Sequence, residues 1–91
     1  MNTEQRLAEI RARLEKAFNP EMLEVDDESH LHIGHEGAKD GRGHFRVHLV
    51  SESFNGINMI GRHRAIYAQM GSLMESDIHA LSIEAYASNE I

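Results

Sequence analysis

Residues 44–51 read HFRVHLVS, and this stretch decides the fold because its side chains alternate in character. Three apolar side chains fall on one face of an extended chain, and three polar ones fall on the other. The apolar set is Phe45, Val47 and Leu49, and the polar set is His44, Arg46 and His48. A period of two is typical of a half-buried strand, so we expect the apolar set in the core and both histidines on the exposed face.

The flanking sequence predicts the elements that pack around this strand. Upstream, residues 3–18 carry apolar side chains at helical spacing. Asn2 or Thr3 can cap that helix, and Asn19-Pro20 ends it. Residues 22–27 have the composition of a strand, and residues 29–43 form a polar loop rich in glycine.

Downstream, Phe54-Asn55-Gly56 predicts a turn, and a helical pattern follows over residues 60–74. Glycine costs a helix interior about 1 kcal/mol relative to alanine, so we expect a break at Gly61. Residues 81–86 alternate again and predict a last strand.

The order α-β-β-α(α)-β predicts an α+β fold with helices on one face of a three-stranded mixed sheet. The first two strands should pair antiparallel, and the last should join them after a helical crossover. The expected core consists of Leu7, Ile10, Leu14, Phe18, Phe45, Val47, Leu49, Tyr67, Leu81 and Ile83.

The composition is that of a globular domain with an acidic balance. The chain has 91 residues, of which 41% are hydrophobic, and this length predicts a single domain over residues 1–91. The net charge of -6 opposes nucleic-acid binding through a uniformly basic surface, although residues 42–64 are locally basic. Without cysteine, this chain offers a metal only nitrogen and oxygen. We recognise neither a signal peptide nor a membrane span, so we expect a cytoplasmic protein with no membrane partner.

Seven histidines carry the candidate chemistry, since neutral imidazole is the commonest metal ligand in proteins. His30, His32 and His35 crowd one loop, which suits either a metal site or a solvated polar loop. His79 precedes the last strand, where it is either a structural histidine or a ligand. His63 lies between two arginines at a core-facing helical position, and hydrogen bonding within the fold is at least as good an interpretation as a contact role.

Motifs for catalysis are not found. The sequence has no P-loop, no dinucleotide glycine motif and no nucleophile–base signature. We therefore expect a protein that is not an enzyme.

Four segments, in order and at matching spacing over roughly residues 5–87, resemble the BolA family. They are Leu23-Glu24-Val25-Asp26-Asp27-Glu28-Ser29, His44-Phe45-Arg46-Val47 with Val50-Ser51, Phe54-x-Gly56-x-x-x-Ile60-x-Arg62-His63-Arg64-x-Ile66-Tyr67, and Ile78-His79-Ala80-Leu81-Ser82-Ile83. Each segment alone is a weak signal, but the set is specific.

The resemblance implies a small module similar to the type II KH fold and a role as a non-catalytic adaptor. Members of the family pair with monothiol glutaredoxins and share a [2Fe–2S] cluster with them and glutathione. They are also linked to transcriptional and stress-related morphology control. Carried onto this chain, the resemblance places one cluster ligand at His79 and a second at His32, with His35 as the alternative. The isolated chain is then expected to hold no cofactor and to be a monomer or a weak homodimer.

Two other functions stay open at this stage. Arg46, Arg62, His63 and Arg64, with Arg42 nearby, could contact the phosphates of DNA in a transcriptional regulator. The acidic net charge counts against this, as does the lack of a G-x-x-G motif in the helical region. Alternatively, the histidine loop could bind a metal by itself. A steep fall of DNA affinity with salt would identify the first function, and metal analysis of the purified chain would identify the second.

Overall fold

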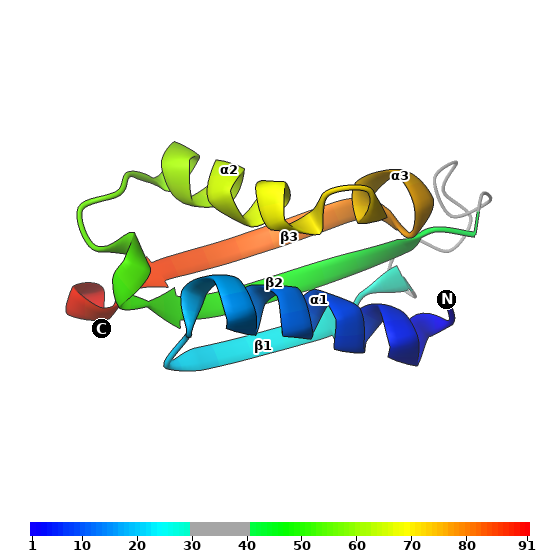
Figure 1. The fold of residues 1–91 in the computed structure, drawn as a ribbon, viewed down its shortest axis with the longest axis horizontal. Coiled ribbons are helices and arrows are strands. Elements are labelled where there is room, and N and C mark those ends of the chain that lie inside the picture. The colour runs from blue at the N-terminus through cyan, green and yellow to red at the C-terminus, as the bar shows by residue number, and fades with distance from the viewer. Residues whose placement is uncertain (30–40) are drawn as a thin grey trace.

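The computed structural model describes residues 1–29 and 41–91 (Figure 1). Helix α1 spans Thr3–Phe18, strand β1 spans Met22–Asp27, and strand β2 spans Gly43–Ser51. The rest of the chain forms the 3-10 turn η3 (Glu52–Phe54), helices α2 (Met59–Met70) and α3 (Leu73–Ser76), strand β3 (Ile78–Ala87) and the 3-10 turn η4 (Ser88–Glu90). This is the order of helices and strands that the sequence predicts.

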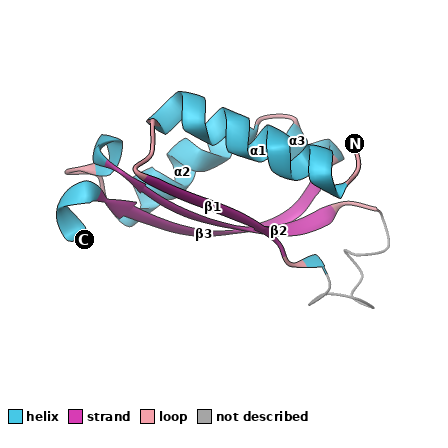
Figure 2. Ribbon diagram, turned by 90° about the horizontal axis from the view of Figure 1, so that it is seen from below, coloured by secondary structure: helices cyan, strands magenta, loops and turns pink. Residues whose placement is uncertain are grey.

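The three strands form one mixed sheet in the order β1-β2-β3. β1 and β2 run antiparallel, whereas β2 and β3 run parallel. Parallel neighbours need a crossover connection, which α2 and α3 supply. Figure 2 shows the helices on one side of the sheet, and no helix of the described residues covers the other side. The predicted α+β architecture is therefore confirmed.

Helix α1 begins and ends at residues that suit its two ends. The Asn2 side chain accepts the N–H of Gln5 at 2.8 Å, and the Gln5 side chain accepts the N–H of Asn2 at 2.9 Å, which makes a capping box. Asn19 takes a left-handed φ of 43° and donates its N–H to the carbonyl of Glu15. The buried face of the helix consists of Ile10, Leu14 and Phe18.

The second helical region is interrupted at Gly71, and the prediction of a break at Gly61 is wrong. Gly61 lies in the first turn of α2, where an N–H has no partner within the helix. The Asn58 side chain accepts this N–H at 2.8 Å, so the cost of glycine in a helix interior does not arise. Gly71 has a φ of 51° and ends α2, and α3 begins at Leu73.

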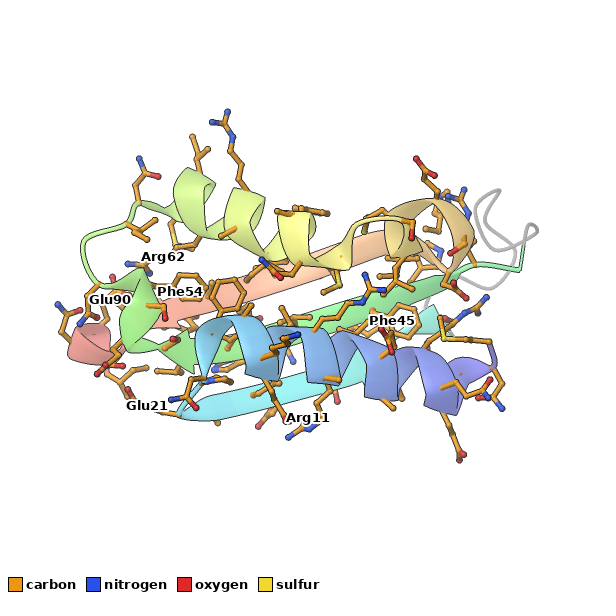
Figure 3. The ribbon with its side chains drawn as sticks, viewed as in Figure 1. Arg11, Glu21, Phe45, Phe54, Arg62 and Glu90 are labelled. Carbon is orange, nitrogen blue, oxygen red and sulfur yellow. The ribbon has the colours of Figure 1, made fainter. Side chains whose placement is uncertain are left out.

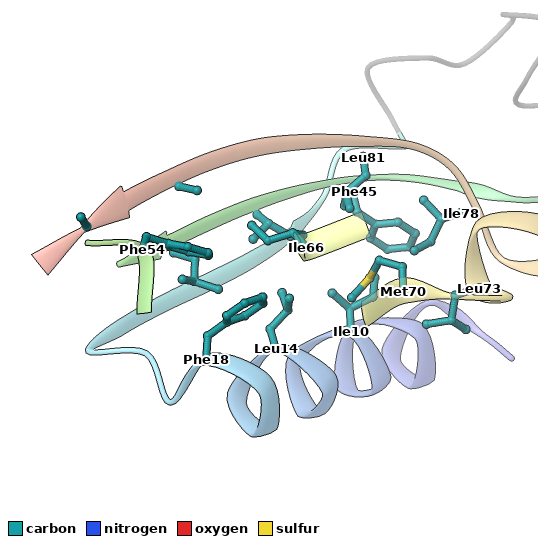
Figure 4. Close-up of a cluster of buried hydrophobic side chains, with 14 residues drawn as sticks. Ile10, Leu14, Phe18, Phe45, Phe54, Ile66, Met70, Leu73, Ile78 and Leu81 are labelled. Atoms are coloured by element: carbon teal, nitrogen blue, oxygen red, sulfur yellow. The ribbon is translucent and has the colours of Figure 1, made fainter. Parts of the chain in front are cut away.

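The core lies between the sheet and the helices, as Figure 4 shows. The alternating face of β2 is buried as predicted, with Phe45, Val47 and Leu49 all inside. Phe54, which the sequence places in a turn, is also buried, and its ring centroid lies 4.9 Å from that of Phe18.

The expected core also needs one correction. Tyr67 is 40% exposed and donates its hydroxyl to the carbonyl of Leu81. Tyr67 lies off the core because a different face of α2, formed by Arg62, Ile66 and Met70, is turned toward the sheet. Leu7 and Ile83 pack against the core but are only partly buried. None of the helices in the described ranges is long and apolar enough to cross a membrane.

Candidate functional site

The candidate site lies where β2 and β3 both begin, at one end of the sheet. Gly43 is paired with Ile78, but His44 is paired with Ala80, so His79 is an extra residue in β3. An inserted residue of this kind re-aims side chains. Here it lets both Ile78 and Leu81 enter the core while His79 stays exposed.

Three side chains converge at this bulge. The ring centroids of His44 and His79 lie 5.0 Å apart, with the ring planes inclined by 57°. Nη2 of Arg42 lies 3.1 Å from Nδ1 of His79, and Nη1 of Arg42 donates to the carbonyl of Met74 at 3.4 Å. The prediction that His44 faces solvent is wrong, since it is only 5% exposed. The bulge explains part of this burial, because it brings the His79 ring against His44.

Two glycines hold the backbone on either side of Arg42. Gly41 has a φ of 82°, a conformation that favours glycine. A Cβ on Gly43 would meet Cε2 and Cζ of Phe45 at 2.6 and 2.8 Å, so the ring packs directly on this backbone. The N–H of Gly43 donates to the carbonyl of Asp77 at 2.9 Å. The start of β2 is thus fixed to the residues just before His79.

Asp77, which directly precedes β3, anchors the start of this strand through its carboxylate. Its carboxylate accepts hydrogen bonds from the Ser76 hydroxyl at 2.6 Å and from Nε of Arg6 at 2.9 Å. The N-terminal amine of Met1 lies 3.8 Å from the same group. The hydrogen bond from Ser76, followed by that from Arg6, lowers the pKa of Asp77 below its ordinary value. An ionised carboxylate therefore links the N-terminal part of α1 to the segment that carries His79.

The open face of the sheet carries a separate ionic group. Nη2 of Arg46 donates to Glu84 at 2.7 Å, and Nδ1 of His48 lies 3.0 Å from the other Glu84 oxygen. Hydrogen bonds from Arg46 first and His48 second lower the pKa of Glu84, and Glu84 raises the pKa of Arg46. Asp26 lies 3.7 Å from Arg46 on the other side. Arg46, predicted as a contact residue, is thus engaged with carboxylates of its own sheet.

Arg62 occupies the opposite end of the sheet and points into the fold (Figure 3). It is only 6% exposed, and it donates to the carbonyls of Ile57 and Ala85 at 2.7 and 3.1 Å. Its guanidinium also makes a two-pronged pair with Glu90 of η4, at 2.7 and 3.1 Å. This pair lowers the pKa of Glu90 and raises that of Arg62. A phosphate contact by Arg62 would require this arrangement to open.

The other predicted contact residues of α2 differ in accessibility. Arg64 is exposed and can reach a partner. His63 is partly buried, and its Nε2 atom is enclosed without a hydrogen-bond partner among the described residues. The hydrogen bond expected for His63 within the fold is therefore not found at this nitrogen.

Known proteins share the fold of this chain. A family model described as BolA-like protein matches residues 14–90. The chain belongs to the BolA family. The solved BolA domain of SufE1 from Arabidopsis thaliana is similar to it with a TM-score of 0.85 and 38% identity, covering 100% of this chain and 99% of that domain.

Curated relatives differ in how much of their own length this chain covers. SufE-like protein 1 of Arabidopsis thaliana is 40% identical over 87 residues, which cover 90% of this chain but only 24% of that protein. The Escherichia coli K12 protein named DNA-binding transcriptional regulator BolA is 38% identical over 81 residues, covering 89% of this chain and 74% of that protein.

The described side chains at this site include nitrogen donors of the kind that bind iron. His79 presents an exposed imidazole with a second imidazole beside it, and such nitrogen ligands suit iron. Within residues 1–29 and 41–91, no group of three or more potential ligand residues could hold a metal ion. A metal bound at His79 would need further ligands from beyond these residues.

Sequence reasoning predicted His79 as a ligand but did not predict the side chains that lie beside it. His30, His32 and His35 lie outside the described residues, so the loop ligand and the metal-binding loop stay predictions. Arg42 and His44 join the site through the register between β2 and β3, for which local sequence gives no signal. The burial of Arg62 has a signal in the sequence, since Arg62 lies in step with Ile66 and Met70 at spacings of four.

Proposed function

We propose that this protein is a non-catalytic adaptor that pairs with a monothiol glutaredoxin and shares a [2Fe–2S] cluster with it. His79 and His32, with His35 as the alternative, would supply nitrogen ligands, while a partner cysteine and glutathione supply sulfur. The observation that carries the proposal is the exposed imidazole of His79 on a bulge at the end of the sheet. The cytoplasmic location expected from the sequence belongs to the same proposal.

The composition supports a shared site. Because the chain has no cysteine, thiolate ligands have to come from the partner. Neutral imidazoles in place of two thiolates make an iron–sulfur site less negative and raise its reduction potential, as in Rieske centres. Imidazole must be unprotonated to bind a metal, so such a site should also be labile in acid.

The structure supports different tasks for the two ligands. His79 lies on a strand whose start is tied down by Asp77 and by the N–H of Gly43. A side chain on such a backbone is placed before the partner arrives, which reduces the ordering cost of binding. We therefore propose that His79 binds first and that the histidine from the loop binds second.

The test is reconstitution. The chain is mixed with a monothiol glutaredoxin, glutathione, iron and sulfide, and the visible spectrum and the mass of the complex are recorded. His32→Ala should weaken the cluster while the apo complex persists. His48→Ala is the matched control, because His48 lies on the same open face but pairs with Glu84.

One result would count against the proposal, and another would change its loop ligand. If His48→Ala changes the spectrum as much as His79→Ala, the site at the bulge is wrong. If His35→Ala has a larger effect than His32→Ala, the loop ligand moves to His35.

A second candidate is DNA binding, which the printed name of the Escherichia coli relative favours. In this chain Arg64 is exposed, whereas Arg62 and Arg46 already pair with carboxylates. Fluorescence anisotropy with duplex DNA over a range of salt concentrations tests this function. A steep loss of affinity with salt that shrinks in Arg64→Ala would support it, and no binding at low salt would exclude it.

A further inference from the structure

The contact between Arg42 and His79 fixes where the imidazole proton lies. A guanidinium has five N–H donors and no acceptor, so it can only donate. At 3.1 Å from Nη2, the Nδ1 atom of His79 must therefore be the acceptor. A neutral imidazole that accepts at Nδ1 carries its proton on Nε2.

We propose that Arg42 is a gate on His79 that must move aside before this histidine binds a metal. The inference rests on the ligand role of His79 proposed above and adds the residue that controls it. Arg42 is a positioning residue in this account, because it acts through the imidazole.

The gate acts whichever nitrogen becomes the ligand. If Nδ1 binds the metal, the Arg42 guanidinium occupies the lone pair that the metal needs. If Nε2 binds the metal, the proton has to move to Nδ1, and two N–H groups would then face each other. Both routes require Arg42 to leave its present position.

The backbone places Arg42 for this task. Gly41 with its left-handed φ and Gly43 against the Phe45 ring hold the turn on either side. Nη1 of Arg42 also donates to the carbonyl of Met74, which directs the guanidinium over the start of β3. The Arg42 contact with His79 is therefore supported by backbone contacts on both sides.

The positive charge of Arg42 should make the gate respond differently to cations and to anionic clusters. A free divalent cation is repelled by the guanidinium and meets a covered lone pair. The all-sulfur cluster that a glutaredoxin carries before transfer has thiolates at every ligand position, so it is anionic and attracts the guanidinium, which can draw Arg42 away from His79. We expect Arg42 to favour transfer of an anionic cluster over capture of a bare metal cation.

The test measures the chemical reactivity of the His79 imidazole in the free chain. Diethyl pyrocarbonate attacks the unprotonated nitrogen of neutral imidazole, and peptide mass spectrometry gives the rate at each histidine. In Arg42→Met at a pH of about 8, the rate at His79 should rise about two- to fivefold, the factor that one exposed hydrogen bond supports. Nitrogen-15 NMR should show the Nδ1 signal of His79 losing its hydrogen-bonded character.

Lys16→Met is the matched control, because it removes one positive charge from an exposed position on α1. It should leave the rate at His79 unchanged, and an equal rise in this variant would overturn the gate. An unchanged rate at His79 in Arg42→Met would overturn it as well. If Arg42→Met is unfolded by circular dichroism, the tautomer of His79 in the wild type decides. Arg42→Lys is compared with the wild type by nitrogen-15 NMR, and a neutral His79 whose proton lies on Nδ1 in the wild type would contradict the gate.

The outcome is separable from that of the proposed function. Both readouts use the free chain, so the gate can fail while His79 still proves to be a cluster ligand. Conversely, a cluster spectrum that does not change in His79→Ala would remove the ligand role, and the gate would fall with it.

Discussion

Two arginines near opposite ends of the sheet have opposite surroundings. Arg62 is buried, and its guanidinium pairs with Glu90 and donates to two backbone carbonyls. Arg42 is only partly buried, and its guanidinium meets the imidazole of His79. The comparison shows that one residue type can have two roles in this fold. Arg62 stabilises one end of the sheet, and Arg42 is the proposed gate on His79 at the other end.

The largest effect should come from removing the side chain that anchors the His79 end. Phe45 is buried, and its ring lies against Gly43. Phe45→Ala should lower the free energy of unfolding by about 3–5 kcal/mol, the usual cost of losing a buried aromatic side chain. Denaturant titration measures this, and a loss under about 1 kcal/mol would show that the faces of β2 are misassigned.

A smaller effect at the same end is expected from Gly43→Ala. The added Cβ would lie within 2.8 Å of two ring carbons of Phe45, so the ring or the strand must shift. Overpacking of this kind costs about 1–3 kcal/mol. Equal urea midpoints for wild type and Gly43→Ala would show that the close approach is not needed.

The scaffold role of Arg62 predicts a loss of stability without a change at His79. Arg62→Met leaves Glu90 and two carbonyls without their donor, so the urea midpoint should fall by more than in Arg42→Met. Carbethoxylation of His79 should stay at the wild-type rate. A faster rate at His79 in Arg62→Met would mean that the two ends are coupled and that the comparison fails.

Low pH should weaken the ion pair between Asp77 and Arg6, which anchors the start of β3 next to His79. Because the folded pKa of Asp77 is lowered, its stabilisation is fully present above the ordinary unfolded pKa of about 4 and is lost as the pH falls through the lowered value. The gap in unfolding free energy between wild type and Asp77→Asn should therefore be constant at neutral pH and shrink below a pH of about 4. A gap that persists unchanged to pH values of about 2 would contradict the lowered pKa.

Local patterns predicted most of the fold. The alternation over residues 44–51 gave the correct buried face of β2, and the apolar spacing of residues 3–18 gave the bounds of α1. These features depend on neighbouring residues, which a sequence displays directly. The break was predicted at Gly61 instead of Gly71. The sequence could not show that Gly61 lies in the first turn of α2, where glycine costs a helix little.

The candidate site was less predictable, because it depends on pairing between distant segments. The bulge that exposes His79 exists only in the register of β2 with β3. That register also brings Arg42 and His44 to His79, which reverses the expected exposure of His44. Arg62 was misjudged because its partner Glu90 comes from the end of the chain.

The ligand role of His79 is tested most directly by His79→Ala in the reconstituted complex with a monothiol glutaredoxin. Since His79 is exposed, the variant should keep the circular dichroism of the wild type and still contact the partner weakly. We predict that it cannot hold the mixed-ligand cluster and that the visible spectrum reverts to that of the glutaredoxin's own all-sulfur cluster. A variant that keeps the spectrum and cluster lifetime of the wild-type complex would contradict this account.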